Sequence, residues 1–93
     1  MDAEQIATYT DRIRAAYATL TATSHGRWIP LAQLRDQVGG HREYVEAALQ
    51  QLAGAEDVDF MPESNQKILT AYDRRCAVWV GGQWSHFIAI DAA

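Results

Sequence analysis

Cysteine, proline and lysine are scarce in this chain of 93 residues. The one cysteine, Cys76, cannot form an internal disulfide, and a lone thiol is typical of proteins from a reducing compartment. No apolar run approaches the roughly 20 residues needed to span a bilayer. The start of the chain is acidic at Asp2 and Glu4, whereas a signal peptide begins with cations. The sequence therefore predicts one folded domain over residues 1–93, located in the cytoplasm.

Residue patterns that carry catalysis or bind a cofactor are also lacking. The three histidines stand apart in sequence, and their spacings to Cys76 match no zinc-ligand pattern. The pairs Gly39-Gly40 and Gly81-Gly82 are not followed by the Lys-Ser/Thr of a phosphate-binding loop. There is no nucleophile elbow and no pair of carboxylates at a catalytic spacing. We therefore predict no enzymatic activity, no metal and no cofactor.

The charge balance is acidic, with a net charge of -4. DNA-binding domains are usually basic, because cations must neutralise phosphates, although the local distribution of charge decides the matter. Residues 30–58 hold two cations and five acids, whereas residues 64–90 hold three cations and one acid. Any contact with a phosphate backbone is therefore expected from the last third of the chain.

Apolar residues at helical spacing predict three helices in the first half, over residues 2–21, 30–38 and 41–53. Glycines 39 and 40 follow the second helix as a glycine C-cap would, and the third helix begins directly after them. Two amphipathic helices joined by a tight glycine turn are typical of a helix-turn-helix. A short β-prone segment, residues 27–29, precedes the pair.

The second half predicts strands around a fourth helix. Val58 and Phe60 alternate with polar residues, which indicates a strand, and residues 84–90 predict a final strand. Thr70 and Asp73 have the spacing of a capping box, so we expect a helix over residues 71–79, terminated by Gly81-Gly82. The resulting order is helix, short strand, helix, helix, strand, helix, strand, which belongs to the α+β class.

Residues 41–52, with the sequence HREYVEAALQQL, resemble the recognition-helix segment of GntR-type bacterial regulators. Those proteins tend to show Ser-Arg-x-Thr-Val-Arg-x-Ala-Leu-x-x-Leu there, and residues 30–39 resemble the helix that precedes it. The resemblance covers residues 28–60 and implies a winged helix, with the fourth helix in the place of a plain wing loop. It implies binding of double-stranded DNA in bacterial or phage transcription regulation, with a homodimer formed through Tyr9 and Tyr17 of the first helix.

The side chains that would touch DNA follow from the resemblance for the third helix and from the charge distribution for the last third of the chain. On the third helix, Arg42 matches the pattern, whereas Tyr44 replaces a threonine and Glu46 replaces an arginine. The candidate base readers are Arg42, Tyr44, Glu46 and Gln50, and the candidate phosphate contacts are Lys67, Arg74 and Arg75. Arg42 is the first choice for a base edge.

Each of these residues also has a simpler interpretation, as part of a solvated helix face. The alternative function is a winged helix that binds a protein and not DNA, which the acidic third helix and the extra helix favour. Tryptophan is enriched at protein interfaces, yet we expect Trp28 in the core and at least one of Trp79 and Trp84 buried. Cys76 is expected to be a buried structural residue. A continuous basic face joining Arg42 to the later arginines would favour DNA, and an exposed apolar patch would favour protein.

Overall fold

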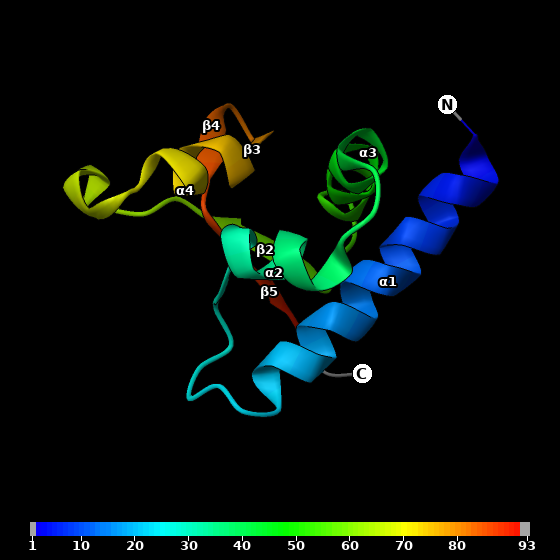
Figure 1. The fold of residues 1–93 in the computed structure, drawn as a ribbon, viewed down its shortest axis with the longest axis horizontal. Helices are drawn as coiled ribbons and strands as arrows, with labels where there is room; N and C mark the ends of the chain where they lie inside the picture. Colours follow the sequence, from blue (N-terminus) through cyan, green and yellow to red (C-terminus); the bar gives the residue numbers. More distant parts are fainter. Residues whose placement is uncertain (1, 92–93) are drawn as a thin grey trace.

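The computed structural model describes residues 2–91, which form four α-helices, a short 3-10 helix and five strands (Figure 1). The helices are α1 (Ala3–Thr21), α2 (Leu31–Val38), α3 (Arg42–Leu52) and α4 (Ala71–Cys76), with the 3-10 helix η1 at Gln66–Ile68. The strands are β1 (Ile29–Pro30), β2 (Val58–Met61), β3 (Val78–Val80), β4 (Gln83–Ser85) and β5 (Phe87–Ile90). The predicted α+β class is confirmed.

The three helices predicted in the first half are present within one or two residues of their expected ends. The side chain of Asp2 caps α1 by accepting a hydrogen bond of 2.9 Å from the backbone N–H of Glu4. Pro30 directly precedes α2, where its fixed φ suits the entry to a helix. No helix within residues 2–91 combines the length and the apolarity needed to cross a membrane.

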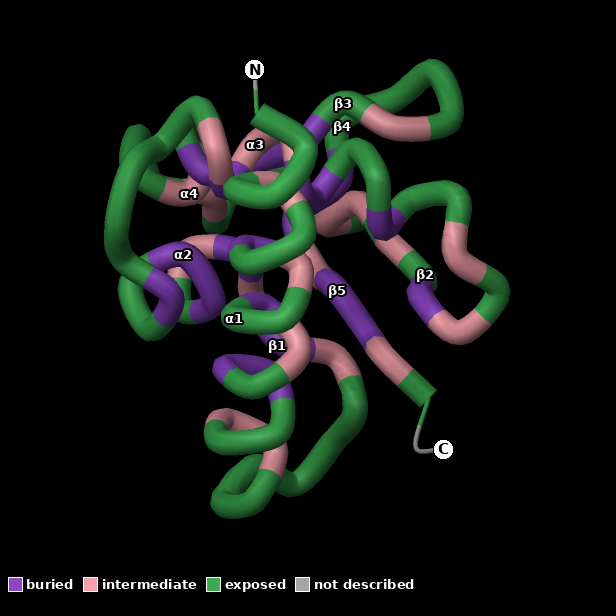
Figure 2. Tube along the Cα trace, turned by 90° about the vertical axis from the view of Figure 1, so that its right-hand side faces the viewer, coloured by how far each residue is buried: buried purple, intermediate pink, exposed green. Residues whose placement is uncertain are grey.

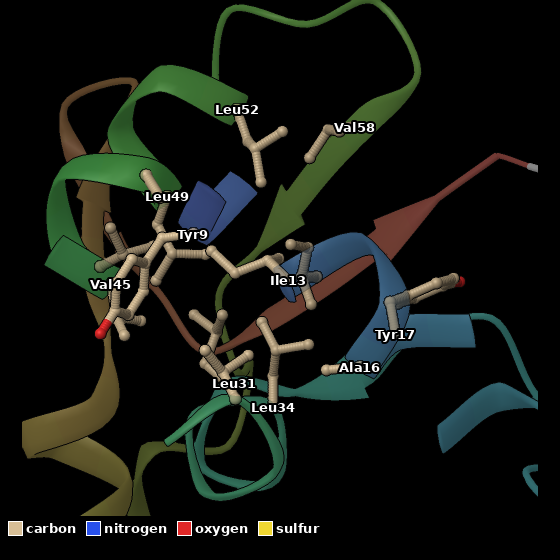
Figure 3. Close-up of a cluster of buried hydrophobic side chains, with 14 of the residues drawn as sticks. Tyr9, Ile13, Ala16, Tyr17, Leu31, Leu34, Val45, Leu49, Leu52 and Val58 are labelled. Atoms are coloured by element: carbon tan, nitrogen blue, oxygen red, sulfur yellow. The ribbon is translucent and has the colours of Figure 1, made fainter. Parts of the chain in front are cut away.

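The core lies where α1, α2 and α3 pack against one sheet (Figures 2 and 3). Ile13 of α1, Leu34 of α2 and Leu49 of α3 are completely buried, and Ile88 of the central strand is buried beneath them. Figure 3 shows side chains from all three helices converging on one cluster. Burial of this shared apolar stripe is the main stabilising contribution in a domain of this size.

The sheet beneath the helices has three antiparallel strands in the order β1-β5-β2. Strands β2 and β5 pair over four residues each, from Val58 opposite Ile90 to Met61 opposite Phe87. The chain leaves the sheet after β2 and returns only at β5. We call residues 62–86, which lie between these two strands, the β2–β5 connection. It contains η1, α4 and a separate two-stranded sheet of β3 and β4.

The predicted capping box at the start of α4 is confirmed. The Thr70 hydroxyl accepts from the Asp73 N–H at 3.0 Å, and the Asp73 carboxylate accepts from the Thr70 N–H at 2.9 Å. The helix ends earlier than expected, at Cys76, because Ala77 has an extended backbone with φ -63° and ψ 153°. The prediction of a helix as far as Trp79 was therefore wrong.

Gly81-Gly82 is a hairpin turn and does not terminate a helix, which corrects a second prediction. Both glycines have positive φ, 60° and 80°, as a type I′ turn between two strands requires. Trp79 pairs with Trp84 across this hairpin, which we call the tryptophan hairpin (β3, Gly81-Gly82 and β4). The final strand expected over residues 84–90 is consequently divided, with β4 in the hairpin and β5 in the main sheet.

Burial also differs from three expectations. Trp79 and Trp84 are 50% and 55% exposed, so the prediction that at least one is buried was wrong. Trp28 is only half-buried, and the Arg27 guanidinium lies over its ring. Tyr9 and Tyr17 are both buried in the core, so they cannot form the expected dimer surface on α1. Cys76 is buried, as predicted.

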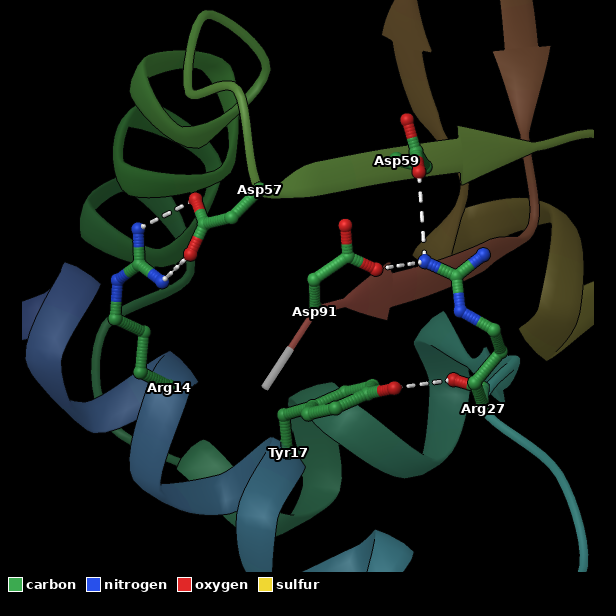
Figure 4. Close-up of polar contacts among 6 residues, drawn as sticks. All are labelled: Arg14, Tyr17, Arg27, Asp57, Asp59 and Asp91. Carbon is green, nitrogen blue, oxygen red and sulfur yellow. Dashed lines mark hydrogen bonds and ion pairs between the residues drawn. The ribbon is translucent and has the colours of Figure 1, made fainter. Parts of the chain in front are cut away.

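Polar contacts on one side of the domain tie α1 to the sheet (Figure 4). Arg14 of α1 donates two hydrogen bonds, of 2.7 and 3.2 Å, to the Asp57 carboxylate that precedes β2. Arg27 donates to Asp91 at 2.5 Å, and its backbone carbonyl accepts from the Tyr17 hydroxyl. The two ion pairs have half-exposed side chains, so they orient the elements more than they stabilise them.

The glycine turn between α2 and α3 allows a sharp test. Gly39 and Gly40 have φ of 64° and 78°, which side chains disfavour, and a Cβ at Gly40 would also collide with the buried Tyr9 ring. We expect Gly40→Ala to lower the free energy of unfolding by about 2–4 kcal/mol, since both strain and overlap apply. Gly39→Ala, whose Cβ meets no atom within 4 Å, is the matched control and should cost about 1 kcal/mol. Equal losses in urea denaturation would show that the contact with Tyr9 is unimportant.

Candidate functional site

One face of α3 carries three of the four candidate base readers. Arg42, Glu46 and Gln50 are four residues apart, so they lie on the same side of the helix. In the structure this side faces α2 and the β2–β5 connection, and each of the three side chains has a partner there. The Arg42 guanidinium donates to the backbone carbonyl of Arg75, and the Gln50 amide donates to the carbonyl of Trp79 at 2.8 Å.

Glu46 is the partner of a buried arginine. Arg35 of α2 is only 8% exposed, and its guanidinium donates to the Glu46 carboxylate at 2.9 Å. The same guanidinium donates through Nε to the carbonyl of Cys76, also at 2.9 Å. A buried guanidinium needs a countercharge, so the acid at position 46 has a structural role here. Arg35 thereby links α2, α3 and the end of α4.

Tyr44, the fourth candidate base reader, lies on another side of α3. It is half-buried against the core and stacks on Tyr9 of α1, with ring centroids 5.4 Å apart. The exposed residues of α3 are Arg42, Glu43, Gln50 and Gln51. Arg42 is the one cation among them and has an acid beside it, so the helix presents little that a phosphate backbone would attract.

The candidate phosphate contacts lie together on the β2–β5 connection. Lys67 is in η1, and Arg74 and Arg75 are in the last turn of α4. Arg74 donates to the carbonyl of Gln66 at 2.9 Å, which joins α4 to η1. Arg75 is exposed beside the Tyr72 ring and lies next to Arg42 through the carbonyl contact described above. The structure therefore brings Arg42, Arg74 and Arg75 into one region.

The tryptophan hairpin presents the largest exposed aromatic surface on the same connection. Its inner residue Val78 is completely buried, whereas Trp79 and Trp84 point outward from the other face of the hairpin. Their rings lie 5.3 Å apart in an edge-to-face arrangement. Such a pair supports itself but leaves about half of each side chain in contact with water. Other exposed apolar side chains on the connection are Ile68 and Tyr72.

Two hollows flank the buried His86 on the connection. The first, of about 190 Å³, is lined by apolar residues including Pro30, Leu69 and Phe87 together with the acids Glu63 and Asp73. The second, of about 230 Å³, is lined by Gln66, Arg74, Ala77, Trp84 and His86. His86 accepts a hydrogen bond at Nδ1 from the Glu63 N–H at 2.9 Å, so its neutral form is the one that fits.

The sequence grouped Arg42, Glu46 and Gln50 on one face correctly, but it did not predict that each of them is hydrogen-bonded to another part of the chain. It also missed the pairing of Trp79 with Trp84. A signal was present, because Val-Trp-Val, two glycines and Gln-Trp-Ser form the pattern of two short strands around a two-residue turn. Within residues 2–91, no three His, Cys, Asp or Glu side chains gather in a way that would hold a metal ion.

Comparisons with known proteins add no relative to this description. No protein-family model, no curated protein and no solved structure matches the chain.

The ion pair of Arg35 can be tested by neutralising its partner. We expect Glu46→Gln to lower the free energy of unfolding by about 1–2 kcal/mol, because a buried guanidinium loses its countercharge. The cost stays below that of a fully buried pair because the Glu46 side chain is 38% exposed. Glu43→Gln, on the solvent side of the same helix, is the control and should change the value by less than about 0.5 kcal/mol. Equal effects in chemical denaturation would rule out the structural role of Glu46.

The buried histidine predicts how stability depends on pH. Burial lowers the pKa of His86, and the nearby Arg74 lowers it further, although Glu63 and Asp73 act in the opposite direction. An unfolded histidine titrates near pH 6.5, so the unfolded chain binds this proton more readily than the folded chain. His86 therefore stabilises the fold above about pH 6.5, and this contribution is lost as the pH falls below that value.

The variant His86→Asn keeps an acceptor for the Glu63 N–H but cannot be protonated. We expect its unfolding free energy to decline less than that of the wild type between pH 7 and pH 5 in denaturation experiments. His25→Asn, at an exposed position, should keep the wild-type decline. Identical pH profiles for the wild type and the His86 variant would contradict the assignment.

Proposed function

We propose that the chain is a winged-helix domain that binds a protein partner through the tryptophan hairpin. The order α1, β1, α2, α3, β2, β5, with the sheet order β1-β5-β2, supports the winged helix. In that arrangement the β2–β5 connection stands in the place of the wing. It is longer than a simple loop and carries a helix and a hairpin of its own.

The observation that carries the proposal is the exposed, edge-to-face pair of Trp79 and Trp84. Tryptophan is enriched among the residues that contribute most to protein binding, and large exposed apolar patches on small domains are often functional. The hairpin is firmly placed, since Val78 is buried beneath it and Gln50 of α3 donates to the Trp79 carbonyl. A preorganised aromatic surface loses little conformational entropy when a partner binds.

The bonding of α3 supports protein over DNA. A recognition helix needs free side chains that can reach base edges in the major groove. Here the Glu46 carboxylate is bound to Arg35, the exposed Arg42 and Gln50 side chains each use one donor on a carbonyl of the connection, and an acid, Glu43, lies beside Arg42. The single free thiol, buried at Cys76, is in keeping with a protein of the cytoplasm.

DNA binding in transcription regulation is the second candidate, and one observation favours it. Arg42, Arg74 and Arg75 lie in one region, as expected of a basic face that contacts a phosphate backbone. If the domain binds DNA, the β2–β5 connection would provide most of the phosphate contacts. A dimer on a two-fold operator would need a contact other than the buried Tyr9 and Tyr17.

The two candidates are separated by replacing both tryptophans. Threonine keeps the preference for a strand, so we expect the Trp79→Thr, Trp84→Thr double variant to stay folded, with an unfolding free energy lower by about 1–2 kcal/mol. Partner proteins are captured on the wild-type chain from a nuclease-treated lysate and purified. Each is then titrated against the wild type and against the double variant in a calorimeter. We expect the double variant to lose binding by a factor of about 30 or more.

A 30-base-pair mixed-sequence duplex, titrated with the purified wild type at low salt, provides the opposing measurement. We expect no salt-dependent binding. Duplex binding that weakens steeply with salt and is unaffected by the tryptophan replacements would replace the protein proposal with DNA binding.

A further inference from the structure

The cations of this domain fall into two groups. Arg14, Arg27 and Arg35 each pair with a carboxylate elsewhere in the fold. In the part of the chain that the structure describes, Arg42, Lys67, Arg74 and Arg75 have no carboxylate within 4.0 Å. All four lie on the β2–β5 connection or on the first turn of α3 beside it. Among residues 2–91, the one other arginine or lysine without a carboxylate within 4.0 Å is Arg12, on α1 over the Tyr9 ring, and it donates to the Val38 carbonyl at 2.6 Å.

The acids of the connection are already engaged locally. The Asp73 carboxylate accepts from the Thr70 N–H in the capping box, and the Glu63 carboxylate accepts from the Asn65 N–H at 3.0 Å. Residues 62–86 hold three cations and two acids, whereas the rest of the chain holds five cations and ten acids. The connection therefore has a net charge of +1 in a domain that is acidic as a whole.

The unpaired charge lies next to the exposed aromatic surface. Arg74 and Trp84 line the same hollow of about 230 Å³, with Ala77 at its side, and His86 separates it from the neighbouring hollow, which Glu63 and Asp73 also line. Arg75 and Arg42 extend the cations toward α3. A ligand seated against Trp84 would thus meet apolar surface at its centre and guanidinium groups along one side.

We propose that this surface binds an acidic segment of a partner protein that carries a large apolar side chain as its anchor. The anchor packs against Trp79 and Trp84, and the carboxylates of the segment pair with Arg74, Arg75 and Arg42. Guanidinium groups suit this task, because they bind carboxylates through two parallel hydrogen bonds. This inference rests on the proposed function and adds the chemistry of the partner.

A peptide matches the charge pattern better than a nucleic acid does. A duplex carries a charge about every 1.7 Å along its axis, so phosphates would also meet the acids beside the cations. Glu43 follows Arg42 directly, and Asp36 is held at α4 by its hydrogen bond with Tyr72. A peptide with a few carboxylates around one anchor avoids these two acids.

The test is a selection from a random 12-residue peptide library displayed on phage. The wild-type chain is the target, and phage that also bind the Trp79→Thr, Trp84→Thr variant are removed first. We expect the retained peptides to be enriched in aspartate and glutamate around a large apolar residue. The best of them is synthesised and titrated against purified variants by calorimetry.

We expect Arg74→Gln with Arg75→Gln to weaken that peptide about fivefold to tenfold and to reduce its dependence on salt. Trp84→Thr alone should weaken it about thirtyfold. Arg12→Gln is the matched control. Like Arg75, Arg12 lacks a carboxylate partner among the described residues and lies over a tyrosine ring, but it is on α1 and not on the β2–β5 connection. It should leave the affinity unchanged.

Each of the other outcomes would overturn the acidic partner, the proposed function, or both. Peptides that depend on the tryptophans but are basic or uncharged would leave the proposed function standing and overturn the acidic partner. The absence of any tryptophan-dependent peptide would overturn both. A single-stranded (dT)20 oligonucleotide that binds through Trp84 and Arg74, when no peptide does, would show that the surface recognises nucleic acid.

Discussion

The buried guanidinium of Arg35 is the constraint on which the arrangement of this domain depends. It lies where α2, α3 and the end of α4 meet, and it binds both the Glu46 carboxylate and the Cys76 carbonyl. A buried charge is costly unless it is paired and hydrogen-bonded, and here Nη2 and Nε of Arg35 have partners whereas Nη1 has none among the described residues. Since one of those partners is a backbone carbonyl of the β2–β5 connection, the connection is held against the helices and is not free to act as a loose loop.

The docking of the connection determines what α3 has left to offer. Like Arg35, Arg42 and Gln50 each donate to a carbonyl of the connection, from the first and the last turns of the helix. The polar stripe that a DNA-reading helix would show to the major groove is here hydrogen-bonded to other parts of the chain. The exposed Trp79 and Trp84 lie on the connection, and Arg42 lies where the connection meets α3.

The sequence was sufficient for the parts of the fold that follow local rules. The stripe of Tyr9, Ile13 and Tyr17 predicted α1, and Thr70 with Asp73 predicted the start of α4, because periodicity and capping act over a few residues. The hairpin was not predicted, because Gly81-Gly82 follows the residues predicted to be helical, 71–79. Two glycines at that place fit the end of a helix as well as a turn. The hydrogen-bond partners of Arg42, Glu46 and Gln50 could not be predicted from local rules. Helical spacing shows that these residues share a face, but not which other segments of the chain contact that face.

The exposure of Trp79 and Trp84 has no explanation in the folding of the domain alone. Side chains alternate along a strand, so a hairpin that buries Val78 must direct its neighbour Trp79 to the other face, and the register then places Trp84 opposite. Threonine or another β-branched residue would satisfy the strand at both positions and would expose less apolar surface. Two large rings kept in water, beside arginines that lack carboxylate partners in the described chain, are therefore the observations on which the proposed partner site rests.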